Sequence, residues 1–247
     1  MTKSAFAFDI VIPLGPNDKN VVENTLYYAA KNIIGFRHIF VISYYPNIIF
    51  KTPYTTVIDE NIFPFQKSEL LPLLGDRTGW YLQQLIKLYA VFVVPNILPN
   101  ILVLDSDTIF LKPTEFFQNG LPLYNVGSEY HSPYFAHMNR LHPSLTRQCQ
   151  QSGICHHMIF QKHILEKIID LVETFHNEPF YKTFIQCIAS NEIPFSGASE
   201  YEIYFHYLHH FHKNQFQIRL LKWTNLPRNN GKNTDDYDYI SFHWYLT

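Results

Sequence analysis

The sequence contains few charged residues and shows no strong bias toward either sign. Lysine, arginine, aspartate and glutamate make up 16% of the 247 residues, and the formal net charge is −2. The charges are scattered along the chain, whereas proteins that bind nucleic acids concentrate lysine and arginine in a patch or stripe. The sequence therefore predicts no nucleic-acid partner.

Cysteine is scarce as well. The chain has three cysteines, at Cys149, Cys155 and Cys187, an odd number without the spacing of a metal site. This usage is typical of reduced thiols in a reducing compartment. We therefore expect a cytoplasmic protein.

Long uninterrupted hydrophobic segments are also missing. The longest apolar region, residues 88–104, is interrupted by Pro95 and Pro99, whereas a membrane-spanning helix needs about 20 predominantly apolar residues. The first 15 residues contain one lysine and a short apolar run that Asp9 and Pro13 interrupt, a poor match to a secretory signal. The sequence predicts no transmembrane segment and leaves a peripheral membrane contact open.

Apolar material for a core is abundant. Apolar residues make up 47% of the sequence, and 21 phenylalanines and 17 tyrosines supply most of the aromatic residues. A chain of this length and composition folds as one large domain or as two small ones that share a sheet.

The pattern of apolar residues and turn formers predicts an α/β fold. Phe8–Pro13 and His38–Ser43 are apolar runs of strand length, and residues 20–32 between them have helical periodicity, with Asp18 as the expected cap. A strand, a helix and a strand within about 40 residues are typical of a right-handed βαβ unit. We therefore expect a Rossmann-type, mixed but mostly parallel sheet flanked by helices.

Further elements continue this alternation. A short strand is expected at Thr55–Ile58, a helix at Gly79–Val94 and a buried strand at Ile101–Leu104. In the second half the pattern predicts strands at 123–126, 152–160 and 239–243 and helices at 162–176 and 180–189. It also predicts a helix from Glu200 that Ser199 caps. The polar residues 131–146 are expected to form a loop with a helical turn over the substrate.

Two aspartates after the buried strand are the main functional signal. Asp105 and Asp107 flank Ser106 just beyond the carboxyl end of this strand, where ligands bind in open α/β sheets. At strand spacing their carboxylates project to the same side and repel each other. A hard divalent cation such as Mg²⁺ or Mn²⁺ relieves this repulsion and often completes its coordination with substrate phosphates. We predict a site for a metal ion and a diphosphate, with a simple acidic turn as the alternative.

Residues near other predicted strand ends suit a nucleotide pocket. The turn after the first strand contains Pro13 and Gly15, and Asp59 follows the third strand as a carboxylate for a base or ribose. Arg77 precedes the Gly79–Val94 helix and Lys87 lies on it, where either could meet a phosphate. Ordinary polar loops and an exposed helix lysine are the alternative. The candidate nucleotide-binding residues are thus Pro13, Gly15, Asp59, Arg77, Lys87 and Ser106.

Histidines in the second half suggest another function. His206 and His210 have the i, i+4 spacing of zinc ligands on a helix. The glutamate that follows the first histidine in zinc proteases is replaced here by Tyr207. A zinc-dependent hydrolase is therefore an alternative function.

The segment from the Gly79–Val94 helix through LVLDSDTIFLKP resembles the donor-site core of GT-A glycosyltransferases, and most closely the glycogenin-like group and its relatives. The resemblance implies a GT-A-like fold and a hexosyltransferase-like enzyme that moves a sugar from a UDP-linked donor to an acceptor hydroxyl with Mn²⁺ or Mg²⁺. It also implies one catalytic domain over residues 1–247, with a nucleotide-sugar-binding half (1–112) and an acceptor-binding half (113–247). The acceptor would be a glycan, a lipid-linked sugar or a protein. A catalytically inactive nucleotide-sugar-binding protein is the other alternative.

The resemblance further implies roles for single residues. Lys87 has the position of a basic residue that supports the diphosphate, and His243 that of a C-terminal histidine that completes the metal shell. The family's His-x-x-Gly-x-x-Lys-Pro-Trp ending is absent, because this chain ends in SFHWYLT. The lysine that holds the β-phosphate from that ending has no counterpart, so retention and inversion of the anomeric centre both stay open.

If the anomeric centre is inverted, a carboxylate must deprotonate the acceptor hydroxyl. Inverting members place this acid at a helix start in the second half, where Glu200 and Glu202 stand. Because a capping box could occupy Glu202, Glu200 is the preferred base, and two acids that merely stabilise the helix dipole are the alternative. His156 and His157 are candidate ligands for sugar hydroxyls, or packing residues.

Overall fold

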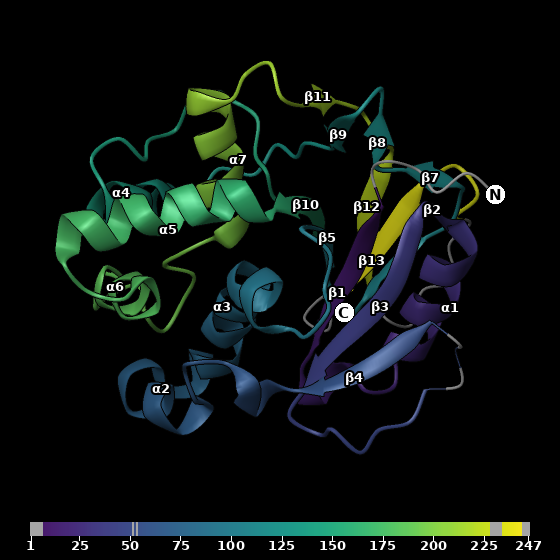
Figure 1. Ribbon diagram of the computed structural model, residues 1–247, viewed down its shortest axis with the longest axis horizontal. Coiled ribbons are helices and arrows are strands. Elements are labelled where there is room, and N and C mark those ends of the chain that lie inside the picture. Colours follow the sequence, from purple (N-terminus) through teal and green to yellow (C-terminus); the bar gives the residue numbers. More distant parts are fainter. Residues whose placement is uncertain (1–6, 51, 53, 228–233, 244–247) are drawn as a thin grey trace.

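A central five-stranded sheet organises the chain (Figure 1). The computed structural model describes residues 7–50, 52, 54–227 and 234–243, apart from the side chain of His243. In sheet order the strands are β10 (His157–Gln161), β5 (Asn100–Leu104), β1 (Phe8–Leu14), β3 (Phe36–Ser43) and β4 (Thr55–Asp59). Neighbouring strands are parallel except for β10, which runs antiparallel to β5. The predicted α/β class, with a mixed and mostly parallel sheet, is confirmed.

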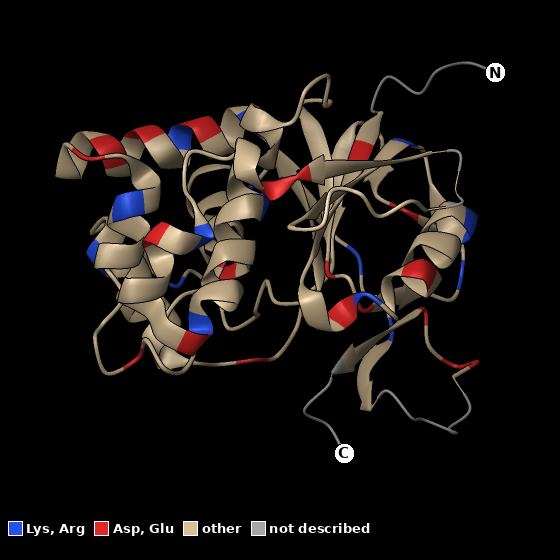
Figure 2. Ribbon diagram, turned by 90° about the horizontal axis from the view of Figure 1, so that it is seen from below, with Lys and Arg blue, Asp and Glu red and all other residues tan. Residues whose placement is uncertain are grey.

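Helices cover both faces of this sheet, as predicted (Figures 1 and 2). On one face, α1 (Val22–Asn32) packs beside β6 (Thr108–Phe110). On the other face, α3 (Thr78–Val93) contacts β1 and β5, and α5 (Lys162–His176) contacts β10. The helices packed around α3 and α5 are α2 (Lys67–Leu74), α4 (Ser132–Leu141), α6 (Phe180–Gln186) and α7 (Glu200–Phe211).

Smaller sheets connect the two halves of the chain. The order β12-β13-β6 brings β13 (Tyr239–His243) beside β6, and Phe242 N donates to the carbonyl of Asp107 at 3.0 Å. Strand β12 (Trp223–Pro227) pairs in parallel with β13. The remaining short elements are β2 (Ile33–Ile34), β7 (Thr114–Glu115), β8 (Phe117–Gln118), β9 (Leu121–Tyr124), β11 (Gln217–Ile218), and the 3-10 helices η1 (Pro16–Asp18), η2 (Glu60–Ile62) and η3 (Gly75–Arg77).

The prediction for residues 131–146 was wrong in its main point. Instead of a loop with one helical turn, they contain the ten-residue helix α4. Tyr134, His137, Met138 and Leu141 are buried at i, i+3, i+4 and i+7 and form one helical face. A histidine in this apolar stripe concealed the pattern, because histidine is ordinarily counted as polar.

Two further local predictions need correction. Asp18 does not cap α1, whose N-cap is Val21; its carboxylate instead accepts a hydrogen bond from Ser106 Oγ at 2.8 Å. Strand β10 begins at His157 and not at Ser152, because His156 has φ 64° and interrupts extended backbone. By contrast, α5 and β13 have the predicted bounds.

The hydrophobic core lies between the sheet and the helices. Ile10, Val11 and the whole of Ile101–Leu104 have 0% exposed surface. Strands β1 and β5 lie inside the sheet and are covered on both faces, which explains their continuous apolar sequences. Helix α5 contributes one buried face, formed by Ile164, Leu165, Ile168 and Val172.

Two buried histidines make stability depend on pH. His137 is fully buried and bonds through Nε2 to the carbonyl of Phe184 at 2.8 Å, while His157 packs against Phe110 and Tyr239. Burial lowers the pKa of His137 to about 4 and that of His157 to about 3, from an ordinary value of 6.5. Between pH 6.5 and 4 these two histidines therefore bind more protons in the unfolded chain than in the native protein, and their contribution to stability falls as the pH falls.

Between pH 6.5 and 5 we expect each of these histidines to lower the free energy of unfolding by roughly 1.6 kcal/mol. Asp107, whose pKa burial raises to about 7, binds its proton in the native protein across this range and offsets part of that decrease. Urea denaturation across this range measures the decrease. A His137→Leu variant removes one titrating group and should show a shallower decrease than the wild type. An equally steep decrease in this variant would contradict the role of His137.

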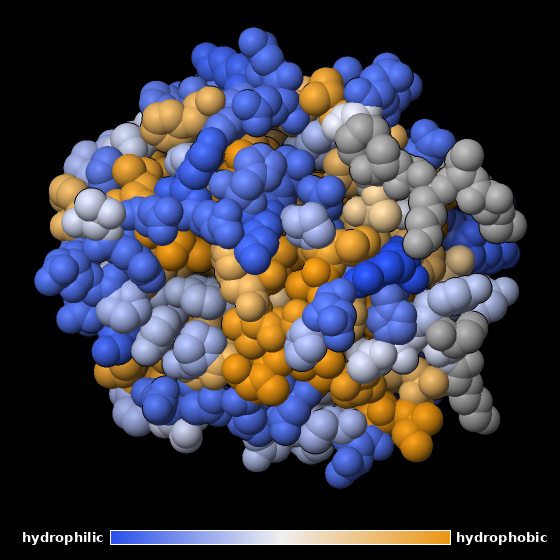
Figure 3. Space-filling view, in the orientation of Figure 1, coloured by the Kyte–Doolittle hydropathy of each residue, from blue (hydrophilic) through white to orange (hydrophobic). Residues whose placement is uncertain are grey.

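The surface is mixed in character. Figure 3 shows apolar side chains gathered near the centre of the face seen in Figure 1, with hydrophilic side chains around them. Within the described parts of the chain, no helix is both long and apolar enough to cross a membrane. Exposed apolar side chains are common on folded proteins and do not by themselves indicate a partner.

Candidate functional site

A cavity of about 420 Å³ lies beside the turns that follow β1 and β5. This is where parallel sheets bind ligands, because the chain crosses in opposite directions on either side of β1 and leaves a crevice there. Residues from α3, from the start of α7 and from the segment around β9 and α4 complete the wall. The lining consists of Asp18, Arg77, Trp80, Gln83, Gln84, Lys87, Asp105, Ser106, Asp107, Glu129, Tyr134, Ile154, His156, Ser196, Ser199, Glu200 and Tyr201.

The Asp-Ser-Asp motif forms the turn between β5 and β6 at the wall of this cavity. Two backbone bonds hold the turn, since Asp105 N donates to the carbonyl of His156 at 2.9 Å and Phe242 N donates to that of Asp107. The Asp107 carboxylate also accepts from Ser241 Oγ at 3.1 Å. The motif is therefore held from both β10 and β13, which come from distant parts of the sequence.

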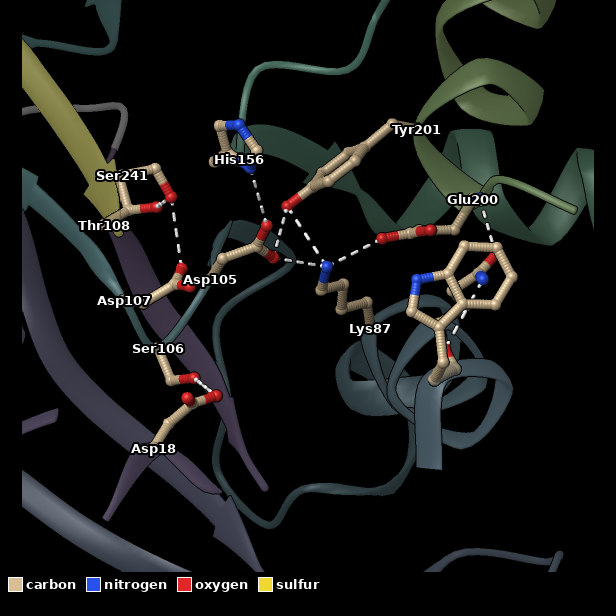
Figure 4. A network of polar contacts seen from close by, with 12 residues as sticks. Asp18, Lys87, Asp105, Ser106, Asp107, Thr108, His156, Glu200, Tyr201 and Ser241 are labelled. Atoms are coloured by element: carbon tan, nitrogen blue, oxygen red, sulfur yellow. Dashed lines mark hydrogen bonds and ion pairs between the residues drawn. The ribbon is translucent and has the colours of Figure 1, made fainter. Parts of the chain in front are cut away.

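Lys87 connects the motif with the start of α7 (Figure 4). It is 2% exposed, and its Nζ donates to Asp105 Oδ1 at 2.5 Å and to Glu200 Oε1 at 2.7 Å. Tyr201 adds a hydroxyl that donates to Asp105 Oδ1 at 3.1 Å. The alternative of an exposed helix lysine is therefore wrong, because Lys87 is a buried cation between two carboxylates.

The charges of this network perturb one another. Burial lowers the pKa of Lys87, but the neighbouring Asp105 and Glu200 outweigh burial and raise that pKa. Burial likewise raises the pKa of Asp105, but Lys87 and His156 together hold it well below its usual range. For Glu200, burial is the larger influence, and its pKa is raised despite Lys87.

Asp107 lies in a different electrostatic environment. Burial raises its pKa to about 7, and repulsion from Asp105 and Asp18 acts in the same direction. His156 and the hydrogen bond from Ser241 offset this only in part. Negative charge therefore exceeds positive charge at this end of the cavity.

The candidate nucleotide-binding residues divide between two adjoining cavities. Ser106, Arg77 and Lys87 line the main cavity, whereas Pro13 and Gly15 line a smaller one of about 50 Å³. Gln83 lines both cavities, so the two meet there.

Asp59 lies apart from both cavities. Its Oδ1 accepts from Asn61 N at 2.9 Å and thereby caps η2. The neighbouring Glu60 lines the smaller cavity instead.

The two candidate bases occupy different environments. Glu200 lines the cavity and is 4% exposed. Glu202 lies behind the wall, where its carboxylate accepts from Ser152 Oγ at 2.6 Å and Gly153 N at 3.2 Å. The predicted cap of α7 is confirmed, since Ser199 Oγ accepts from Glu202 N at 3.3 Å.

The two candidate acceptor-binding histidines also differ in position. His156 lines the cavity, and its Nδ1 lies 3.2 Å from Asp105 Oδ2. His157 points into the core, is 3% exposed and packs against aromatic rings. The structure therefore brings only the first of the pair to the cavity, because consecutive residues at a strand end point to opposite sides.

The residues expected to bind metal are only partly described. Asp105 and Asp107 lie together at the cavity. The side chain of His243 is outside the described residues, although its backbone, in β13, pairs with Pro227 of β12. In the part of the chain that the structure describes, no group of three or more His, Cys, Asp or Glu side chains is arranged to hold a metal ion.

The histidines of the zinc alternative have other partners. His206 Nδ1 accepts from Gln148 N at 3.1 Å, and its Nε2 faces Glu202 at 3.2 Å. His210 Nδ1 lies 3.0 Å from Gln148 Oε1. The i, i+4 pair thus anchors the segment before Ser152 onto α7, and no observed contact favours the hydrolase.

Ten lining residues were not predicted as site residues, and among them are Asp18, Trp80, Glu129 and Tyr201. Asp18 had been interpreted as a helix cap, and Trp80 as part of an amphipathic helix. Tyr201 directly follows the candidate base, but its sequence position does not reveal that its hydroxyl reaches Asp105. Glu129 stands in a loop without a recognisable motif, so no local signal indicated it.

The chain has a distant structural similarity to a mouse xylosyltransferase. The crystal structure of mouse xyloside xylosyltransferase 1 in its apo form matches with a TM-score of 0.46 and 10% sequence identity, over 98% of this chain and 99% of that chain. No protein-family model and no curated protein sequence matches this chain. A likeness this distant does not identify the activity of the cavity.

Proposed function

We propose that this protein is a glycosyltransferase that moves a sugar from a UDP-linked donor to an acceptor hydroxyl and depends on Mn²⁺ or Mg²⁺. The observation that carries the proposal is the position of Asp105 and Asp107. They stand at the carboxyl end of β5, on the wall of a polar cavity that also contains a buried lysine. The cavity's size and polar lining suit a phosphorylated, hydroxyl-rich substrate.

The carboxylates of the cavity fit a divalent cation. Among the described residues, Asp105 accepts three hydrogen bonds and Asp107 one, and an ionised carboxylate has about four acceptor positions, so both retain capacity. A cation would also relieve the repulsion that raises the pKa of Asp107. Asp105, Asp107 and His243 would hold it. When bound, such an ion supplies Lewis-acid stabilisation of the negative charge that develops on the leaving diphosphate.

Lys87 supports the same chemistry from the protein side. Its ammonium group is held in place by Asp105 and Glu200, so it requires no reorganisation when charge develops nearby. It also orients the Asp105 carboxylate toward the cavity. A preorganised cation of this kind favours departure of the diphosphate.

Glu200 is the proposed base if the reaction inverts the anomeric centre. Its carboxylate lines the cavity, and burial raises its pKa, which makes it a stronger proton acceptor than an ordinary glutamate. The proton leaves the acceptor hydroxyl for a Glu200 carboxylate oxygen as the hydroxyl oxygen bonds to the anomeric carbon, and the C–O bond between that carbon and the nucleoside diphosphate breaks. His156, on the same wall, would bind a sugar hydroxyl.

A second candidate function is binding of a nucleotide-sugar without transfer. It is favoured by the ion pair of Glu200 with Lys87, because a carboxylate held by a buried ammonium group at 2.7 Å is less available as a base. Product analysis separates the two functions, since a binding protein would release no nucleoside diphosphate in the presence of an acceptor.

The remaining features of the proposal follow the sequence. We propose one catalytic domain over residues 1–247, with donor-binding residues mainly in 1–112 and acceptor-binding residues mainly in 113–247. A cytoplasmic location is supported by Cys149, Cys155 and Cys187, which are all free thiols.

A thermal-shift panel tests the proposed function. Purified protein is heated with UDP, other nucleoside diphosphates and their sugar conjugates, each with and without Mn²⁺. We expect a rise in the unfolding temperature that needs both nucleotide and metal, because a ligand that binds the native state stabilises it. If no nucleotide changed the unfolding temperature, with or without Mn²⁺, the transferase proposal would be refuted.

Asp107→Asn is expected to weaken Mn²⁺-dependent UDP binding by at least about tenfold while the protein stays folded, since the amide keeps the shape but loses the charge. Calorimetric titration of UDP at constant Mn²⁺ measures the change. Asp170→Asn on α5 removes the same charge outside the cavity lining and serves as the matched control. Equal UDP affinity in both variants would remove Asp107 from the metal site.

A further inference from the structure

We infer that the acceptor bound in this cavity is a sugar that carries no negative charge, an inference that rests on the proposed transferase function. The lining contains five carboxylates against two cations, Arg77 and Lys87, which leaves a formal charge of −3 with every carboxylate ionised and of −2 with Asp107 protonated. A divalent cation and the diphosphate of a donor carry opposite charges of about equal size and leave this balance nearly unchanged. An anionic acceptor would therefore enter a negative field, whereas a neutral or amine-bearing one would not.

The two cations of the lining already have contacts within the protein, and among the described residues only Lys87 is paired with carboxylates. Lys87 is 2% exposed and already lies between Asp105 and Glu200. Arg77 donates to the carbonyl of Phe195 at 2.7 Å, and its guanidinium stacks over the ring of Trp80 at 4.5 Å. An acidic acceptor could therefore pair with Arg77 but not with Lys87, and it would face five carboxylates on the same lining.

Glu129 adds a negative charge at the cavity from the half of the chain proposed to bind the acceptor. It stands in the loop between β9 and α4, is exposed, and lines the cavity together with Tyr134 and His156. Across the described residues, its carboxylate has no hydrogen bond or ion pair. Its charge is not compensated by a bonded partner and faces whatever enters from this side.

The remaining lining residues match a sugar better than a lipid chain. The rings of Trp80, Tyr134 and Tyr201 offer flat apolar surfaces for the C–H face of a pyranose, and carboxylates accept from its hydroxyl groups. Ile154 is the single aliphatic side chain in the described lining, so an acyl chain would find little apolar contact. The cavity therefore selects a hydroxyl-rich acceptor and, among such acceptors, disfavours acidic ones.

Three phenyl β-glucosides that differ only at C6 test the inference: the glucoside with its hydroxymethyl group, the glucuronide with a carboxylate, and the 6-amino-6-deoxy glucoside with an ammonium group. Their binding to the donor-free full chain is measured by saturation-transfer NMR at low salt. We expect the hydroxymethyl and ammonium compounds to bind at least about threefold more tightly than the carboxylate, the effect of one unit charge about 6 Å away in water. The difference should shrink at high salt, because ions screen the field.

Glu129→Gln should reduce the ratio between the strongest and the weakest of the three affinities by about threefold, because it removes one negative charge from the cavity lining. Glu166→Gln removes the same charge from the exposed surface of α5, outside the lining, and should leave the affinity ratios unchanged.

Three results would each overturn the inference. The wild type could bind the carboxylate compound as tightly as the other two or more tightly, or it could bind none of the three. The third such result is that Glu129→Gln leaves the ratios of the three affinities unchanged. Failure of the proposed function is visible separately, as the absence of a nucleotide-dependent thermal shift, which is measured without any glycoside.

Discussion

Glu200→Gln is expected to lower the rate of sugar transfer by about 10²- to 10⁴-fold, the usual contribution of a general base. The amide retains the size and polarity of the carboxylate but cannot accept the proton of the acceptor hydroxyl. Because donor contacts are unchanged, nucleotide binding in a thermal-shift assay should persist. The rate is measured as nucleoside diphosphate released with an acceptor present, with Mn²⁺ and donor saturating.

Glu202→Gln is the matched control for this prediction. Glu202 lies on the same helix two residues away, but its carboxylate is bonded to Ser152 and Gly153 behind the cavity wall. We expect this variant to be less stable yet to transfer sugar at a rate close to that of the wild type once folded. NMR of the product anomer completes the test, since an inverted product from a fully active Glu200→Gln enzyme would eliminate Glu200 as the base.

Lys87→Met is expected to destabilise the protein by about 3–5 kcal/mol, because it leaves the Asp105 and Glu200 carboxylates buried without their common counter-ion. Transfer should be lost as well, since the preorganised positive charge disappears from the cavity. Urea denaturation measures the stability, and product release at a temperature where the variant is folded measures the activity.

The control for Lys87→Met is Lys112→Met. Lys112 is paired with Asp238 at 3.5 Å on the surface, with its side chain 46% exposed. Such an exposed pair contributes about 0–1 kcal/mol. The double variant Lys87→Met/Glu200→Gln should recover part of the lost stability, because it also removes one of the two carboxylate charges that Lys87→Met leaves without a counter-ion. If Lys87→Met proved no less stable than Lys112→Met, the buried network would not hold the site together.

The secondary structure near the acidic motif was predictable because its signals are local. The apolar run Ile101–Leu104 is buried on both faces, as such a run requires, and it ends at Asp105. The helix before it, α3, differs from the predicted bounds by one residue at each end. Helix α4 was missed because a buried histidine, His137, occupies a place in its apolar face.

The partners of the motif could not be predicted, because they depend on long-range packing. Lys87 was expected at the phosphate, but the sequence does not show that Glu200, 113 residues away, shares its ammonium group. The contact of Tyr201 with Asp105 depends in the same way on the docking of α7 beside α3. Hydrogen bonds between elements follow from the packing of whole helices and strands and leave no trace in local periodicity.

The sequence by itself determined the α/β class, the order of the main elements, and the place of two aspartates at the carboxyl end of a buried strand. These depend on alternation, apolar runs and turn formers, which act over a few residues. Only the tertiary structure decided that His156 faces the cavity while His157 lies in the core, and that Glu200 lines the wall while Glu202 stands behind it. Neighbouring residues of the same type were separated in this way because the direction of each side chain is set by the strand end or helix face that carries it.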